Sequence, residues 1–311
     1  MQRYIAIRLV LAVVTVIGIS IIVFLMARIS GDVTALLLPP EDVSRPEDFV
    51  RLRAAYGLDK PVVEQYFVWI GNLLQGDFGE SIRFRQPALD LIWLKIPNTA
   101  KLAAVTAVFT LIIGVSIGIV SALKPGGLSD RFGRGIALLG QAAPNFVVAI
   151  LLILLLAVQW RLLPTSGMGS AKNYIMPAFS LGLFSIAALV RMSRSAMLDV
   201  LDRDHIKLAR LNGVPETSII VRHALKNAAI PIITLFSVQF IFFVSGSVIV
   251  ETIFAWPGMG RLTIEAIRAR DYPLVQAIVL MVGIGVVLMN LLVDLLYAWI
   301  DPRIRLSAGP A

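Results

Sequence analysis

The charged residues of this chain are spaced so that six long uncharged stretches remain. Each has 18 or more residues without Asp, Glu, Lys or Arg, and the six are Leu9–Ala27, Leu102–Leu123, Gly135–Trp160, Asn173–Val190, Asn227–Val250 and Tyr272–Val293. About 20 apolar residues in a helix cross the hydrocarbon core of a bilayer. The pattern predicts an all-α membrane protein that forms a single domain over residues 1–311. Its six predicted spans lie at about residues 9–28, 101–123, 135–160, 173–192, 227–250 and 273–300.

The third and fourth stretches are the least regular. Gly140 and Pro144 interrupt the third, and Pro177 lies in the fourth. A helix bundle tolerates such residues where neighbouring helices or water satisfy the freed backbone groups. The first stretch follows Arg3 and Arg8, as a secretory signal would, but it is too long and lacks a small-x-small cleavage site, so we expect a retained anchor.

The positions of the basic residues predict the orientation. With six spans, Lys and Arg number 14 on each side, but omitting the 74-residue segment Arg28–Lys101 leaves 14 on the terminal side against 5. Long translocated loops largely escape the positive-inside rule. We therefore expect a multi-pass protein of the bacterial cytoplasmic (inner) membrane with both termini in the cytoplasm, residues 29–100 as an external loop or lid, and residues 191–226 as a cytoplasmic loop.

Composition agrees with this interpretation. Hydrophobic residues make up 58% of the chain and charged residues 15%, which is far from the average soluble domain. The absence of cysteine excludes disulfides, cysteine metal sites and thiol catalysis. The net charge of +8 is explained by the basic cytoplasmic loops, so we expect membrane lipid and no nucleic acid as a partner.

The residues also limit the chemistry that this chain performs by itself. The spans lack the charged groups that ion-coupled carriers use, and only Asp294 lies close enough to a span to act there, with an interfacial ion pair as its simpler role. No Gly-Lys pair exists, so a phosphate-binding P-loop is absent, and no HExxH motif occurs. The two histidines, His205 and His223, do not form a recognisable metal motif. We expect no enzyme activity, no metal and no cofactor in this chain, and uphill transport would need energy from another chain.

The cytoplasmic loop has the pattern of a short bent helix pair. Asp202 or Asp204 is the expected N-cap of the first helix, Gly213 its end, and Pro215 the first turn of the second, with Glu216 near the positive helix end. Ile206, Ala209 and Leu211 form a small apolar edge on the first helix. Such a pair suits insertion into a partner's groove, or equally a position on anionic lipid.

This loop resembles the cytoplasmic EAA loop of ABC importer permeases. Ala209, Gly213 and Leu225 match the second alanine, the glycine and the leucine of that pattern. The sequence departs from it at four positions, Lys207, Leu208, His223 and Lys226.

Other segments resemble the first permease subunit of the dipeptide/oligopeptide (peptide/nickel/opine) transport family. They occur in the family's order from about residue 5 to 305: Tyr56–Pro61, Gln65–Tyr66, Gly76–Ser81, Leu163–Gly167, Val250–Arg261, Arg270–Pro273, Asn290–Tyr297 and Asp301–Arg305.

The resemblance implies a binding-protein-dependent importer. The chain would form half of a translocation pathway beside a homologous second permease, with two ATPase subunits that bind ATP and Mg, and an external solute-binding protein. The bent helices would be a coupling helix seated on an ATPase subunit. Its expected contact residues are Asp204, His205, Lys207, Ala209, Arg210, Gly213, Val214 and Pro215.

Two further groups of residues acquire candidate roles. An external gate or docking surface for the binding protein is expected at Glu251, Trp256, Pro257, Gly258, Arg261 and Asp271, with a structural cap as the alternative. Phe67, Trp69 and Ile70 are expected to pack on the membrane surface. Small and polar residues of the fifth span are expected to line the pathway, with close helix packing, as at Gly114-x-x-x-Gly118, as the alternative. They are Ser237, Gln239, Ser245, Gly246 and Ser247.

Two other classes of function remain compatible with the residues alone. A self-contained secondary carrier or channel would transport by itself under an ion gradient, whereas a membrane scaffold would show no flux even with partners. The solute, whether dipeptide, oligopeptide, nickel chelate, glutathione, oligosaccharide or opine, is not indicated by any residue.

Overall fold

The computed structural model describes residues 2–29, 59–245 and 247–300. Within these residues the chain is almost entirely helical, and the only β pairing is an isolated bridge between Glu80 and Pro87. The fold divides into two compact units. One comprises Met1–Pro97 with Leu262–Leu291, and the other comprises Asn98–Arg261 with Leu292–Ala311.

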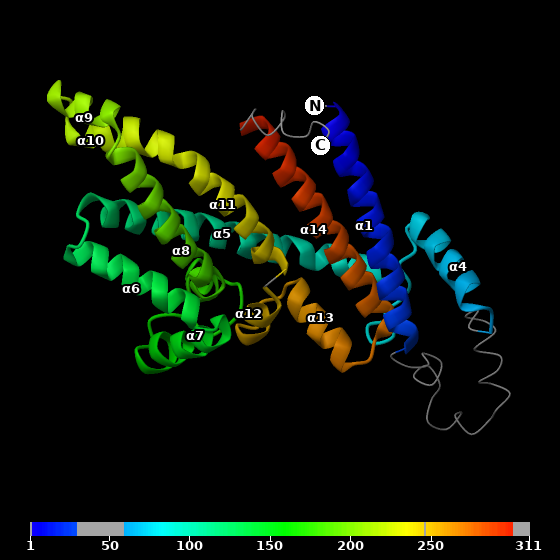
Figure 1. Cartoon of the computed structure of the whole chain (residues 1–311). Helices are drawn as coiled ribbons and strands as arrows, with labels where there is room; N and C mark the ends of the chain where they lie inside the picture. Colours follow the sequence, from blue (N-terminus) through cyan, green and yellow to red (C-terminus); the bar gives the residue numbers. More distant parts are fainter. Residues whose placement is uncertain (1, 30–58, 246, 301–311) are drawn as a thin grey trace. The chain divides into compact units, whose positions relative to one another are not determined.

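The first unit is built on α1 (Gln2–Ile29) and the first part of α14 (Tyr272–Ile300). These helices run side by side (Figure 1), and a β-carbon at Gly283 would come within 3.0 Å of the Ile19 side chain. Glycine therefore permits the close approach of the two helices.

The amphipathic helix α4 (Val62–Leu74) packs on α1 in the same unit. The Ser20 and Tyr66 hydroxyls are 2.8 Å apart, and the Phe24 ring lies against the rings of Tyr66 and Trp69. Trp69 thus packs on α1, and contact of Phe67, Trp69 and Ile70 with the membrane surface stays a prediction. Phe67, with 67% of its surface exposed, remains available to lipid.

The second unit is centred on α8 (Lys172–Leu201), which packs against α6 (Leu128–Ala142) and α11 (Leu225–Ser245). Helix α5 (Ala88–Leu123) also approaches α8 closely: β-carbons at Gly114 and Gly118 of α5 would lie 2.6 and 2.5 Å from α8 side chains. The close packing expected at Gly114-x-x-x-Gly118 is therefore confirmed, because small residues let helix backbones approach.

The remaining elements of the second unit are short. They are α7 (Asn145–Leu152), the π-helix η1 (Ile153–Gln159), α9 (Asp204–Leu211), α10 (Glu216–Ser218), the π-helix η2 (Ile219–Ala224), α12 (Ser247–Ile253) and the start of α13 (Met259–Arg268). In Figure 1, α9 and α10 lie at the end of α8 opposite to α7.

Five of the described helices are long and apolar enough to cross a membrane, or six crossings result if one bent pair is counted. That pair is α6 with α7 and η1, which meet at an angle of 109° across Ala143 and Pro144. The stretch at 135–160 is thus not one straight helix. Pro144 disfavours the helical conformation of Ala143, whose ψ is 122°, and this ends α6.

The fifth predicted span also differs from the structure. Its helix begins at Glu216, since α10, η2 and α11 are continuous, and it ends at Ser245. Arg222 and Lys226 end the uncharged stretch of the sequence, but they do not interrupt the backbone hydrogen bonds of a helix. Residues 30–58 of the predicted lid, Gly246 and residues 301–311 lie outside the described residues.

Candidate functional site

The predicted coupling loop is a short helix, α9, joined by a tight turn to the long helix that starts at Glu216. Neither Asp202 nor Asp204 caps α9, so that prediction was wrong: the N-cap residue is Arg203, whose carbonyl accepts bonds from the Ile206 and Lys207 amides. The two carboxylates instead pair with the Lys207 ammonium, at 3.1 and 3.8 Å.

The end of α9 has the hydrogen-bond pattern of a Schellman motif. Val214 N donates to Ala209 O at 3.1 Å, and Gly213 N donates to Arg210 O at 3.0 Å. Gly213 has φ +75°, and a β-carbon there would meet no atom within 4 Å. Glycine is therefore needed for its left-handed conformation and not for space.

The second helix of the predicted pair is not separate, because it is the first turn of the long helix at 216–245. Pro215 is its N-cap residue, one position before the first turn in which it was predicted. Glu216 accepts two bonds from the Arg210 guanidinium, at 2.8 and 3.2 Å. The turn between α9 and the long helix is thus fixed from both sides.

The two faces of α9 differ sharply. Ile206 is fully buried in a cluster that includes Met197 of α8 and Ile219 of η2. On the opposite side, Leu208 is 58% exposed and Leu211 is 84% exposed. We call Leu208 and Leu211 the docking ridge. From the sequence, Leu211 was placed on one apolar edge with Ile206, and Leu208 was noted only as a departure from a family pattern, so this exposed pair was missed.

Polar side chains border the docking ridge. Asp204, His205, Lys207 and Arg210 are all exposed, whereas Ala209 and Val214 are partly buried against the cluster under α9. An exposed apolar pair with a polar rim is typical of a protein interface.

A second feature, in the predicted external segment, is the buried carboxylate of Glu251. Its Oε1 accepts bonds from the hydroxyls of Thr99 (2.7 Å) and Ser247 (3.0 Å), and its Oε2 accepts bonds from the amides of Gly260 (2.7 Å) and Arg261 (3.2 Å). Burial raises the pKa of Glu251, which lies outside the helices long enough to span the membrane, and the hydrogen bonds act in the opposite direction. Glu251 thus ties the start of α13 to α5 and α12.

Trp256 completes this arrangement, which we call the external clasp: Thr99, Glu251, Trp256, Gly258 and Gly260. The indole Nε1 of Trp256 donates to Asn98 O at 3.0 Å, and its ring lies edge-on to Tyr174. A β-carbon at Gly258 would lie 2.5 Å from Glu251 Oε2, so the turn closes tightly on the carboxylate.

The external clasp changes the interpretation of the predicted docking surface. Glu251, Trp256 and Gly258 are buried, so their side chains and α-carbon do not face a partner in this structure, and the structural-cap alternative fits them. Pro257 and Arg261 are partly exposed.

Asp271 has a similar structural task in the first unit. It is buried, and its Oδ2 accepts bonds from the Ser81 hydroxyl and the Arg83 amide, while Oδ1 accepts a bond from the Leu274 amide at the start of α14. The side chain therefore ties the 80–87 turn to α14 and is not a surface contact.

The predicted pathway residues of the fifth span do not form one polar face. The Ser237 and Ser245 hydroxyls bond to carbonyls of their own helix, at Ile233 and Ile241. Ser247 bonds to Glu251, and Gln239 is only 6% exposed. Gly246 lies outside the described residues. A pathway role for these residues stays a prediction.

Comparison with known proteins decides the family. The model of the family described as binding-protein-dependent transport system inner membrane component matches residues 114–306, and the model of its N-terminal part matches residues 1–103. The chain belongs to this family.

Individual relatives agree with the family assignment. The permease is 38% identical over 306 residues to the glutathione transport system permease protein GsiC of Escherichia coli strain K12, covering 98% of this chain and 99% of the relative. It is 37% identical over the same length to GsiC of Shigella flexneri serotype 5b. A chain of the MetNI methionine ABC transporter in an inward-facing conformation has a similar fold, with a TM-score of 0.57 at 16% identity over 68% of this chain and 96% of that chain.

Family membership confirms the predicted fold class and general function. The permease is a multi-pass inner-membrane subunit of a binding-protein-dependent ABC importer in the peptide/nickel family, and it has no ATPase site of its own. It works with a partner permease, an ATPase and a binding protein. The alternatives of a self-contained carrier and a scaffold are thereby set aside.

Proposed function

We propose that this permease pairs with a homologous second permease to form a heterodimeric pathway for peptides or similar small solutes. An external binding protein delivers the solute, and two ATPase subunits hold ATP and Mg. Both termini lie in the cytoplasm, which places α9 on the side where ATP is available. The basic residues of the predicted cytoplasmic loops support this orientation.

The observation that carries the coupling role is the docking ridge on a firmly anchored α9. Ile206 is buried in a cluster with residues of α8 and η2, which anchors one side of the helix, while Leu208 and Leu211 are exposed on the other side. The turn at Gly213 joins α9 directly to a helix that continues to Ser245. An ATPase subunit that moves α9 would therefore move a membrane helix with it.

The solute class is supported by the relatives. GsiC, a full-length relative, is described as a glutathione transport permease, and glutathione is a tripeptide. The described spans present few charged side chains, which suits weak contact with solutes of varied charge and leaves selection to the binding protein. The external clasp would support a surface of the second unit at which that protein docks.

Replacing Gly213 with aspartate tests the proposal. The change places a β-carbon in the left-handed region and a negative charge at the negative end of α9. In vesicles containing all subunits, we expect the Gly213→Asp importer to hydrolyse ATP at the wild-type rate. Its ATP-driven uptake of short peptides should fall about tenfold, which corresponds to about 1.4 kcal/mol of lost coupling.

Gly76→Asp is the matched control, because Gly76 also has a positive φ (+87°) and open space but lies in the predicted external segment. It should transport like the wild type. Unchanged uptake per ATP in Gly213→Asp would contradict the coupling role, and a wild-type complex that does not take up peptides would contradict the proposed solute class.

A further inference from the structure

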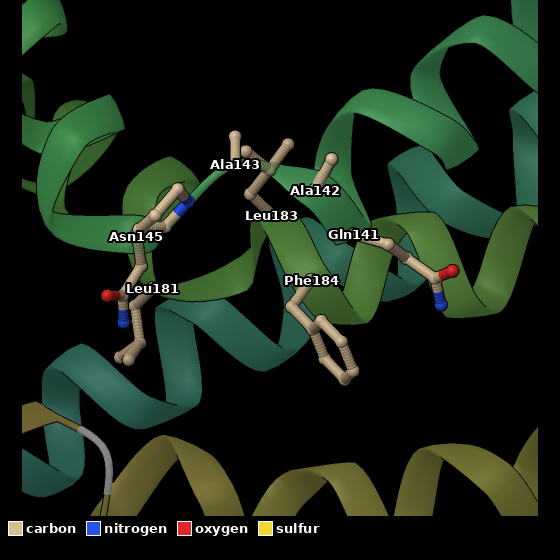
Figure 2. Close-up of a pocket in the computed structure, with 8 residues that line it drawn as sticks. Gln141, Ala142, Ala143, Asn145, Leu181, Leu183 and Phe184 are labelled. Atoms are coloured by element: carbon tan, nitrogen blue, oxygen red, sulfur yellow. The ribbon is translucent and has the colours of Figure 1, made fainter.

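The bend between α6 and α7 opens a pocket of about 380 Å³ in the second unit. The chain segment of the bend forms one wall, and α8 forms the other (Figure 2). The lining residues are Gln141, Ala142, Ala143, Pro144, Asn145, Leu181, Leu183 and Phe184.

The lining combines amide groups with an apolar floor. In Figure 2, Asn145 and Leu181 lie on one side, Gln141 lies on the other, and the Phe184 ring lies between them. The Gln141 Oε1 accepts a bond from the Arg191 guanidinium, so this amide presents its N–H groups as donors. None of the eight lining residues carries a charge.

The break in the helix indicates that water, and not lipid, reaches this pocket. Pro144 is the N-cap residue of α7 and provides no side-chain cap, and the 109° bend interrupts the helix inside an apolar segment. The Pro144 carbonyl accepts bonds from the Val147 and Val148 amides. An unsatisfied backbone group in hydrocarbon costs several kcal/mol, so irregular backbone at membrane depth lines a cavity or is covered by protein. Two side-chain amides at the same place favour the cavity.

We propose that this pocket is a contact site on the translocation pathway for the main chain of a short peptide. The Gln141 and Asn145 amides match the alternating donors and acceptors of a peptide backbone, and Phe184 and Leu181 offer an apolar surface to its side chains. This inference rests on the proposed peptide transport and adds the place where the solute is held.

The absence of cysteine from the chain makes a direct test practical. Asn145→Cys and Ala142→Cys each place one thiol in the pocket. Ile150→Cys is the control, because Ile150 is an exposed apolar residue of α7, the helix that begins at Asn145, and lies outside the pocket. The complete importer in lipid nanodiscs is treated with a charged, membrane-impermeant maleimide. Labelling of this chain is measured by mass spectrometry, with and without a mixture of cysteine-free peptides of two to five residues and the loaded binding protein.

We expect both pocket thiols to react at least about tenfold faster than the thiol of Ile150→Cys, and peptides to slow their labelling at least about threefold. Labelling of the pocket thiols no faster than that of the control thiol would show a lipid-filled pocket and overturn the inference. It would also be overturned if the peptides were taken up into vesicles but gave no protection. Failure of the wild-type importer to take up any of the peptides would instead overturn the proposed solute class. The labelling rates of the thiols without peptide would then still show whether water reaches the pocket.

A functional variant provides a second readout. Asn145→Leu replaces one amide with an apolar group of the same branched shape, and Gln159→Leu also removes an amide, at an exposed position outside the pocket. Asn145→Leu should lower peptide uptake per ATP about threefold to tenfold with ATP hydrolysis maintained, as the loss of one hydrogen bond implies. Equal uptake by both variants would contradict the amide contact.

Discussion

The double variant Leu208→Asp, Leu211→Asp is expected to lose its ATPase subunit on purification and to show no ATP-driven uptake. Both leucines are exposed, at 58% and 84%, so the change does not empty a core. Burial of a leucine at an interface contributes about 1.5–3 kcal/mol, and losing two of them lowers affinity by about 100-fold or more. Two carboxylates would also have to be desolvated. Affinity purification of the complex, followed by uptake in vesicles, measures both effects.

Leu74→Asp is the control for this variant. Leu74 is 83% exposed, nearly as much as Leu211, but it lies at the end of α4 in the predicted external segment. This control should retain the ATPase. If the double variant also purified with a full complement of ATPase, the docking ridge would not be the interface.

The second large effect is expected at Gly260 in the external clasp. A β-carbon there would lie 2.4 Å from Val248 Cα and 3.0 Å from Glu251 Oε2. Because the nearest atom belongs to the backbone of α12, Gly260→Ala must displace that helix or the start of α13. Overpacking of this kind costs about 1–3 kcal/mol, occasionally more. We expect the Tm of the purified permease to fall by about 3–8 °C.

Gly135→Ala is the matched control, since Gly135 lies in α6 with no atom within 4 Å of its would-be β-carbon. Alanine has the higher helix propensity, so this variant should be as stable as the wild type or slightly more stable. Equal melting temperatures for Gly260→Ala and Gly135→Ala would show that the clasp does not constrain the turn.

The sequence predicted those features that depend on local signals. Uncharged apolar stretches predicted the membrane helices, and Gly213 predicted the end of α9, because hydrophobicity and a left-handed turn are both properties of a few adjacent residues. The continuity of the helix from 216 to 245 was missed, since a charge such as Arg222 ends an apolar stretch but not a helix.

The remaining features depend on tertiary packing. In an eight-residue helix, apolar residues at 206, 208 and 211 occupy both faces, and only the cluster beneath α9 shows that Ile206 is buried while the leucines are exposed. The bond between Thr99 and Glu251 joins residues 152 positions apart, for which a single sequence gives no local signal. From the sequence alone, Glu251 is therefore predicted to be a surface charge.

The most direct measurement is a cross-link from the docking ridge. Leu211→Cys and, as control, Leu74→Cys are each coupled to a benzophenone maleimide in the assembled importer, illuminated, and analysed by mass spectrometry. We predict that the probe on Leu211→Cys attaches to an ATPase subunit and that the probe on Leu74→Cys does not. Attachment of the Leu211→Cys probe only to lipid or to the external binding protein would contradict the assignment of α9 as the coupling helix.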